Sequence, residues 1–307
     1  MAGRREPRLE EDVINLLGEP LRVGQHVHSD AHTITQQTID FYLETFDDRH
    51  PYCQQGVETP FGGAVAPPLL YHSEVYRHPE RWYLKNLMGN LHARQEWFLF
   101  APLRAGTQVR TRSTLVDCYR KRNRDYLVNE VDYEDDEGRL LLRGRTHQSF
   151  LIEDADPQRG FVVDRGSSGE KPRRALGEGS GPELVPVELK VDRTLCWRFS
   201  GPGRNYHTDL EQARKLGFPE IVVQGMMSTC LLSQLMANSF DEGWFAGGRM
   251  DIKLVNVLWA GETVRVRGKL REEIELGSQR RRVFDVWVEK TDAARTPVTV
   301  GTASALL

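Results

Sequence analysis

The chain has 307 residues, enough for about two domains, and its 39% hydrophobic and 28% charged residues are typical of a folded globular protein rather than a disordered one. Its net charge of −3 arises from interleaved acidic and basic residues, whereas a nucleic-acid-binding protein needs a concentrated basic face. No apolar run reaches the roughly 18–20 residues of a membrane span, and the charged start lacks the apolar core of a signal peptide. The four cysteines show no CxxC spacing. We therefore expect a cytoplasmic protein without a nucleic-acid or membrane partner.

The first half of the chain predicts a helical segment followed by an antiparallel sheet. An apolar, helix-like segment at residues 68–76 comes first. Residues 96–109 then predict a strand, a bend at Gly106 and the start of a second strand, because alternate residues after the glycine suit a strand with one buried face. A charged hairpin joins two further predicted strands, at residues 126–133 and 140–150.

The second half repeats the same order of features. Residues 225–236 are apolar on nearly every helical face, which predicts a helix buried on most sides. A strand pair at residues 250–264 bends at Gly261, in the same place as in the first half. Another charged hairpin joins the predicted strands at residues 282–289 and 298–305. The two halves are therefore interpreted as copies of one plan.

This duplication predicts an α+β fold of two repeats, each an antiparallel sheet wrapped around a long central helix. The N-terminal repeat is expected at residues 20–152 and the C-terminal repeat at residues 186–307. Residues 153–185, rich in Gly, Ser, Pro and charge, have the composition of a linker between them.

The segment most suggestive of chemistry is residues 199–219, in the second repeat. Thr208 followed by Glu211 predicts a capping box that begins a short helix, and Gly217 is expected to end that helix in the left-handed conformation. His207 then lies at the end of an irregular loop, immediately before a helix start, where it can present its imidazole to a cleft.

This segment resembles the (R)-specific enoyl-CoA hydratases, which are the MaoC-like dehydratases of the hot-dog fold. Their signature is Phe-Ser-Gly-Asp-x-Asn-Pro-x-His-x-Asp, then a short helix, Gly-Phe, and a Gly-Met that begins the central helix. Five parts of the chain match it: Phe199-Ser200-Gly201, His207, Asp209, Gly217-Phe218 and Gly225-Met226. The resemblance implies a double hot-dog fold from about residue 20 to the end.

The chain departs from the signature at one important position. Pro202 stands where the family has its catalytic aspartate. In the first repeat, Asp48 aligns with that aspartate and Pro51 with the family proline, but Cys53 stands where the histidine belongs. Each repeat thus keeps part of a dyad, so a composite site that includes Asp48 is an alternative to a site in the second repeat alone. The family places its dyad in one half, which favours the latter.

The resemblance implies a hydro-lyase that adds water to a 2-enoyl thioester or removes it from a 3-hydroxyacyl thioester. His207 is the expected acid/base; Asp209 either replaces the missing carboxylate or only begins a helix, and Ser233 either supports the site by hydrogen bonding or is a satisfied buried hydroxyl. The expected substrate-binding and oxyanion-binding residues are Gly225, Met226, Arg204, Asn205 and Tyr206. The first repeat, with its degenerate motif, is expected to house the acyl tail.

Two other functions remain open from the sequence. One is a related proton transfer on a thioester or polyketide-like substrate, such as isomerisation or intramolecular oxygen addition (oxa-Michael cyclisation). The other is a non-catalytic subunit that binds an acyl thioester, which Pro202 favours. In every case the partner is an acyl-CoA or acyl-carrier-protein substrate, no separate cofactor is needed, and a homodimer is expected.

A metal site is not expected. His26, His28 and His32 lie close together, but no carboxylate or cysteine accompanies them at ligand spacing, so we interpret them as solvated side chains at strand ends.

Overall fold

The computed structural model describes residues 13–121, 124–151, 176–177, 179–277 and 279–307. The chain forms two compact units that are interleaved along the sequence, and each is described by itself. Unit 1 comprises Met1–His32, Ser73–Glu96 and Val109–Arg174, and unit 2 comprises Thr33–His72, Trp97–Gln108 and Ala175–Leu307. Among the described residues, no helix has both the length and the apolar composition that crossing a membrane requires.

Unit 1 is built on antiparallel strands in the order β1-β3-β4-β5-β2. The strands are β1 (His26–Thr33), β2 (Leu91–Leu99), β3 (Gln108–Lys121), β4 (Arg124–Glu134) and β5 (Leu140–Leu151); residues 97–99 of β2 belong to unit 2. The hairpin β4–β5 confirms the charged hairpin expected near residues 126–150. The core of the unit contains Leu21, Val27, Trp82, Leu84, Leu115, Cys118, Leu127 and Phe150.

The helical segment expected at residues 68–76 is shorter than predicted and is not an α-helix. The chain makes turns there and then the 3-10 helix η2 (His72–Tyr76). Pro67 and Pro68 remove two backbone donors, and the bonds that do form, such as Leu70 N–H to the Pro67 carbonyl, span only three residues. The short helix α2 (Pro79–Trp82) follows. Its N-cap, His78, has the left-handed conformation and directly precedes Pro79.

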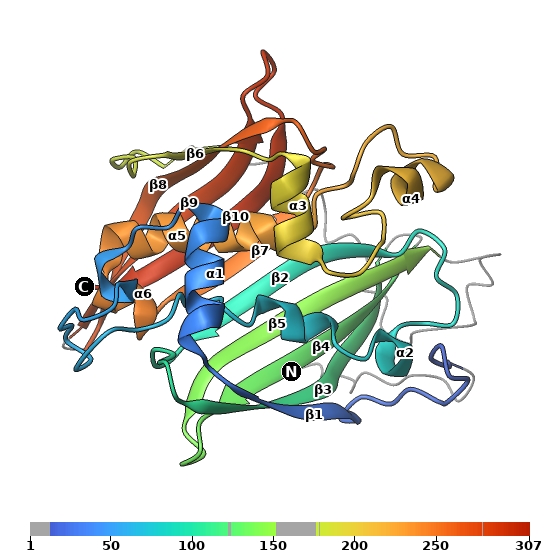
Figure 1. Ribbon diagram of the computed structural model, residues 1–307, viewed down its shortest axis with the longest axis horizontal. Helices are drawn as coiled ribbons and strands as arrows, with labels where there is room; N and C mark the ends of the chain where they lie inside the picture. Colours follow the sequence, from blue (N-terminus) through green and yellow to red (C-terminus); the bar gives the residue numbers. More distant parts are fainter. Residues whose placement is uncertain (1–12, 122–123, 152–175, 178, 278) are drawn as a thin grey trace, which may run out of the picture. The chain divides into compact units, whose positions relative to one another are not determined.

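Unit 2 contains antiparallel strands in the order β7-β10-β9-β8-β6, with the long helix α5 (Met226–Phe240) packed against β8, β9 and β10 (Figure 1). Eleven of its 15 residues are buried, which confirms the expected helix covered on most sides. The strands are β6 (Val187–Lys190), β7 (Arg249–Leu254), β8 (Thr263–Leu276), β9 (Gln279–Lys290) and β10 (Pro297–Leu306).

Shorter helices complete unit 2. They are α1 (Gln36–Phe46), η1 (Pro51–Cys53), α3 (Arg193–Ser200), α4 (Leu210–Lys215) and α6 (Glu242–Phe245). Helix α1 lies across α5 in Figure 1, and the buried Tyr42 of α1 hydrogen-bonds Cys230 of α5. Phe46 of α1 also packs edge-on against Phe199 of α3, with ring centroids 5.5 Å apart.

Antiparallel sheets with separate helices confirm the predicted α+β class. Most of the predicted linker, residues 153–175 and 178, lies outside the described residues. Its last part does not behave as a free connection, because Glu183 forms an antiparallel bridge with Lys269 of β8.

Candidate active site

All nine residues that the sequence proposed for the site lie in unit 2. The loop between α3 and α4 carries His207 and is shaped by Asn205. The Asn205 side-chain oxygen accepts the His207 backbone N–H at 2.7 Å, while its backbone carbonyl accepts from Thr208 and Asp209. A further bond from the Val222 N–H to the Tyr206 carbonyl, at 3.2 Å, ties this loop to the segment that leads into α5. The histidine is therefore fixed by backbone bonds on both sides.

One hydrogen bond determines the tautomer of His207. Its Nδ1 lies 2.7 Å from the Val222 carbonyl oxygen. Because a carbonyl can only accept, Nδ1 carries the proton and Nε2 of the neutral ring has a free lone pair. Burial lowers the pKa of His207, although the bond to Val222 acts in the opposite direction. Within the described part of the chain, Nε2 has no hydrogen-bond partner, so this half-buried imidazole is a neutral base with one available nitrogen.

The Tyr206 ring supports the imidazole from one side. Its centroid lies 4.0 Å from that of His207 and 6.0 Å from that of Phe218. Arg204 is exposed and forms ion pairs with Asp209 and Glu211, so its charge is already neutralised. Tyr206 therefore has a positioning contact with the histidine, whereas Arg204 contacts only acidic side chains of its own loop and helix.

Asp209, rather than Thr208, begins helix α4, so the predicted capping box is wrong. Asp209 Oδ1 accepts the Gln212 N–H at 3.0 Å and Oδ2 accepts from Arg204 Nε at 3.0 Å. The Thr208 hydroxyl is used inside the loop, where it accepts from Asn205 N–H and donates to the Gly203 carbonyl. The Gln212 N–H and Arg204 lower the pKa of Asp209, and with both oxygens engaged it is a weak base.

The end of α4 was predicted correctly. Gly217 has a φ of +83°, in the region that favours glycine, and Phe218 N–H bonds the Ala213 carbonyl as in other left-handed helix ends.

The first turn of α5 offers backbone donors to an anion. Gly225 is the N-cap and has no side chain to cover the helix end, and Met226 is fully buried. In the described residues, no backbone carbonyl accepts the N–H groups of Gly225 or Met226. Free N–H groups and the positive end of the helix dipole together favour negative charge at this position.

Ser233 is buried in α5 and has a partner that the sequence did not indicate. Its hydroxyl accepts a hydrogen bond from the indole Nε1 of Trp244 in α6, at 3.0 Å. Through this bond the hydroxyl satisfies a buried indole N–H.

We expect Ser233→Ala to lower the free energy of unfolding by about 1–3 kcal/mol, because Trp244 loses the acceptor for its buried N–H. Denaturant unfolding measures this loss. The matched control is Ser239→Ala in the same helix, whose hydroxyl bonds only the Leu235 carbonyl and whose loss should cost clearly less. A Ser233→Ala protein of unchanged stability would show that the indole bond does not stabilise the fold.

Asp48 lies in the same unit as His207 but against a different part of α5. It is buried; Oδ1 accepts the His50 N–H at 3.0 Å and its carboxylate also accepts from the Gln234 amide. Gln234 is nine residues beyond Gly225, about 13 Å along the helix axis. Asp48 is therefore held at the second half of α5, whereas His207 is held at the segment before its first turn. Among the described residues the structure shows no contact between the two.

His50, next to Asp48, closes the other end of α5. Its buried Nε2 lies 3.2 Å from the carbonyl of Ala237, in the last turn, and 3.2 Å from Asp241 Oδ1. Its Nδ1 accepts the Tyr52 N–H, so the proton is on Nε2 and both nitrogens are bonded. His50 therefore bonds the C-terminal end of α5.

The sequence interpretation missed His72. Its ring stacks on Phe199 of the Phe-Ser-Gly motif, with centroids 4.5 Å apart and planes at 6°. Nδ1 donates to the Leu69 carbonyl, and Nε2 is buried with no partner in the described part of the chain. Burial lowers the pKa of this histidine to about 4. No sequence signal marks it, because the motif residue it supports lies in the other repeat.

Comparison with known proteins agrees with this architecture. Residues 22–142 match the family described as FAS1-like, dehydratase domain region. A solved MaoC-like dehydratase is 16% identical with a TM-score of 0.70, covering 93% of this chain and 98% of its own. A putative MaoC domain protein dehydratase from Chloroflexus aurantiacus is 14% identical with a TM-score of 0.70, covering 97% and 98%. No curated protein sequence matches the chain.

A third solved structure has a fold that is described as duplicated. A conserved hypothetical protein from Mycobacterium tuberculosis, described as having a double hotdog fold, is 13% identical with a TM-score of 0.59, covering 93% of this chain and 96% of its own. The protein is thus a double hot-dog protein. Its fold is that of the MaoC-like dehydratases, as the motif around His207 implied, and its residues 22–142 match the FAS1-like dehydratase region.

Proposed function

We propose that this protein adds water to 2-enoyl thioesters, or removes it from 3-hydroxyacyl thioesters, with His207 as the acid/base. The observation that carries the proposal is the free Nε2 of a neutral, half-buried imidazole whose other nitrogen is held by the Val222 carbonyl. The match of residues 22–142 to a dehydratase region supports the same reaction.

A single histidine can complete the proposed dehydration. Nε2 of His207 accepts the proton from C2 of the 3-hydroxyacyl thioester, and the electron pair of that C–H bond forms the C2–C3 double bond as the C3–O bond breaks. The proton then passes from Nε2 to the departing oxygen. The products are a 2-enoyl thioester and water, His207 returns to its neutral form, and hydration is the reverse.

The thioester oxygen gains negative charge as the C2 proton leaves. The N–H groups of Gly225 and Met226, at the positive end of α5, are the donors that we assign to it. Asn205 and Tyr206 position His207 through its backbone N–H and its ring. Asp209 is assigned to the cap of α4 and Ser233 to the indole of Trp244, so neither takes part in proton transfer.

A second candidate is a non-catalytic subunit that binds an acyl thioester. It is favoured by Pro202, which lacks a carboxylate, and by Asp209, whose oxygens are both engaged. Under both candidates, several points stay predictions. They are the homodimer, the cytoplasmic location, the repeat boundaries at 20–152 and 186–307, and a thioester carried by CoA or by a carrier protein.

Turnover of enoyl thioesters distinguishes the candidates. The purified full chain is mixed with a panel of 2-enoyl-CoA esters of different chain length, and with the same acyl groups on a carrier protein, while the enone absorbance is followed. Saturable loss of absorbance is the expected result. Tight binding of these thioesters without turnover would establish the second candidate instead, and the absence of both would overturn the two proposals together.

The rate should depend on pH through His207. Protonated Nε2 cannot accept a proton, and burial lowers the pKa of His207 below 6.5. We therefore expect kcat/KM for hydration to rise with pH through a midpoint below 6.5 and to be level by neutral pH. Initial rates across the acid range measure the midpoint. A midpoint at or above 6.5 would contradict the role of the buried neutral ring.

A further inference from the structure

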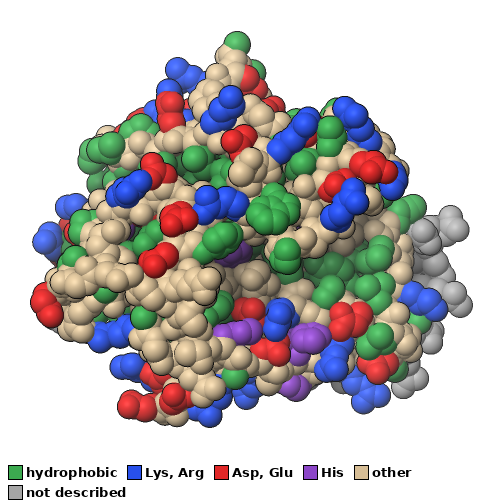
Figure 2. Space-filling view, in the orientation of Figure 1, with side chains coloured by type: hydrophobic (Ala, Val, Ile, Leu, Met, Phe, Trp, Pro, Cys, Tyr) green, Lys and Arg blue, Asp and Glu red, His purple; other side chains and the backbone are tan. Residues whose placement is uncertain are grey.

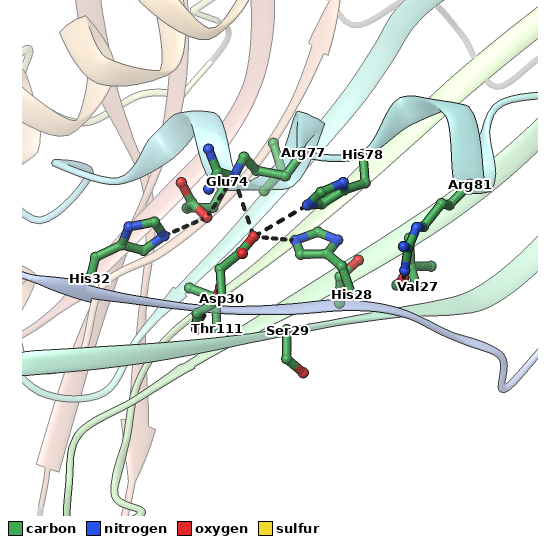
Figure 3. A network of polar contacts seen from close by, with 12 residues as sticks. Val27, His28, Ser29, Asp30, His32, Glu74, Arg77, His78, Arg81 and Thr111 are labelled. Atoms are coloured by element: carbon green, nitrogen blue, oxygen red, sulfur yellow. Dashed lines mark hydrogen bonds and ion pairs between the residues drawn. The ribbon is translucent and has the colours of Figure 1, made fainter.

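A polar cluster in unit 1 joins strand β1 to the segment that contains η2 and the start of α2 (Figure 3). His28 and Asp30 are two residues apart on β1, so both side chains point to the same face of the strand. Glu74 of η2 and His78 face them from the opposite side in Figure 3. Histidine, acidic and basic side chains also gather over this region in the lower part of Figure 2.

His28 is the unusual member of this cluster. It is only 4% exposed, and both ring nitrogens are buried without a hydrogen-bond partner among the residues that the structure describes. The nearest carboxylate oxygen, Oδ2 of Asp30, is 3.8 Å from Nε2, beyond hydrogen-bond distance. The expectation of a solvated strand-end histidine holds for the exposed His26 but is wrong for His28, because η2 and α2 cover the strand there. A buried polar group without a partner is costly unless something binds it.

The donor atoms lie at distances that suit a metal ion. One ligand atom each from His28, Asp30 and Glu74 lies within 4.8 Å of the others. Asp30 Oδ2 lies 3.8 Å from His28 Nε2 and 3.6 Å from His78 Nε2. Atoms bound to a tetrahedral zinc ion at about 2.1 Å are about 3.4 Å apart, so small side-chain rotations would bring these atoms to zinc-binding positions.

The surroundings of the donors also suit metal binding. His78 Nδ1 lies 3.2 Å from Glu80 Oε1, which is the carboxylate–histidine arrangement that orients a metal-bound imidazole. His32 Nε2 lies 2.9 Å from Glu74 Oε2 and steadies that carboxylate. Burial lowers the pKa of His28 to about 4, which keeps the ring neutral as a metal ligand must be.

The charge of the cluster is balanced at present by Arg77. Its Nε lies 3.3 Å from Asp30 Oδ2 and 3.6 Å from Glu74 Oε2. Although burial acts against it, this guanidinium holds the pKa of Asp30 below its ordinary value, so that carboxylate is ionised. The Arg77 side chain is 45% exposed and can turn into solvent. The two carboxylates would then balance the charge of a divalent cation.

We propose that His28, Asp30, Glu74 and His78 bind one divalent transition-metal ion, with zinc best matched to this set of two imidazoles and two carboxylates. The ion would link β1 to residues 74–78, as the ion pairs of Arg77 with Asp30 and Glu74 do now. The site is in unit 1, whereas every residue of the proposed acyl-thioester site is in unit 2, so the two proposals stand or fall separately.

Metal titration of the full chain tests the site. Protein stripped with a chelator is titrated with Zn²⁺ by calorimetry and with Co²⁺ by visible absorption. We expect one ion per chain and a tetrahedral cobalt spectrum, with binding weakened about 10-fold or more in His28→Ala, Glu74→Gln and the more exposed His78→Ala. The control, His26→Ala on the same strand, should bind like the wild type. Absence of stoichiometric binding, or binding that survives all three site substitutions, would overturn the proposal.

Arg77→Met separates a metal site from an ion-pair network. If Arg77 competes with the ion, this variant should bind Zn²⁺ more tightly than the wild type, and Zn²⁺ should raise its thermal midpoint by more. If the cluster is only an ion-pair network, Arg77→Met should lose stability that Zn²⁺ does not restore, and the proposal fails. Melting curves with and without Zn²⁺ for every variant show whether each of them folds.

Discussion

Replacing His207 with asparagine is expected to lower kcat for enoyl-thioester hydration by about 10²- to 10⁴-fold, the usual contribution of a general acid/base. The asparagine amide can still donate to the Val222 carbonyl, as Nδ1 does now, so the loop should keep its shape. What disappears is the lone pair of Nε2. Initial rates on the best ester of the panel measure the loss, and thermal unfolding shows whether the variant is folded.

The matched control for this experiment is Asp209→Asn. Asparagine is as good an N-cap as aspartate, so α4 should still begin at the same residue while the ion pair to Arg204 is lost. We expect a rate close to that of the wild type. A loss as large as that of His207→Asn would mean that the Asp209 carboxylate works beside the histidine, and the single-histidine mechanism would be wrong.

The parts of the fold that local pattern determines were predictable from the sequence. Alternating residues identified the strands that follow Gly106 and Gly261, and both glycines have the positive φ that such bends favour. The apolar residues of α5 identified a helix buried on most sides. The longer helical segment expected at residues 68–76 was wrong, because two prolines outweighed its apolar composition and only a 3-10 helix forms.

A candidate site could be proposed from the sequence, but the hydrogen bonds that its residues make could not be predicted. The motif pointed to His207, yet its tautomer depends on the Val222 carbonyl, which only the folded chain brings to it. Ser233 is paired with the indole of Trp244, and no pattern in the sequence points to that pairing. From the sequence we expect no metal site around His28: the neighbouring Asp30 is not counted as a ligand there, and Glu74, far along the chain, comes near the strand only in the folded protein.

Asp48→Ala should lower the free energy of unfolding by about 2–4 kcal/mol, because it leaves the buried His50 N–H and the partly buried Gln234 amide without their acceptor. The rate per folded molecule should not change, since Asp48 contacts the second half of α5 and not the loop of His207. Denaturant unfolding and active-site rates on the same preparation measure the two effects. A folded variant that is slow at saturating substrate would restore the composite site as the better interpretation.

Asp48→Asn should behave in the opposite way, and its effect should depend on pH. Burial raises the pKa of Asp48 above its ordinary value of 3.8, so the ionised carboxylate destabilises the folded state at neutral pH. The amide removes that charge, still accepts the His50 N–H, and can donate to Gln234 Oε1, which is buried and has no partner among the described residues. The variant should therefore match or exceed the wild type in stability at neutral pH. Its advantage should shrink as the pH falls through the raised pKa and vanish below 3.8, where Asp48 is protonated in both states. Unfolding curves at neutral and acid pH measure this difference, and an Asp48→Asn protein as unstable as Asp48→Ala would show that the charge itself holds His50 and Gln234 in place.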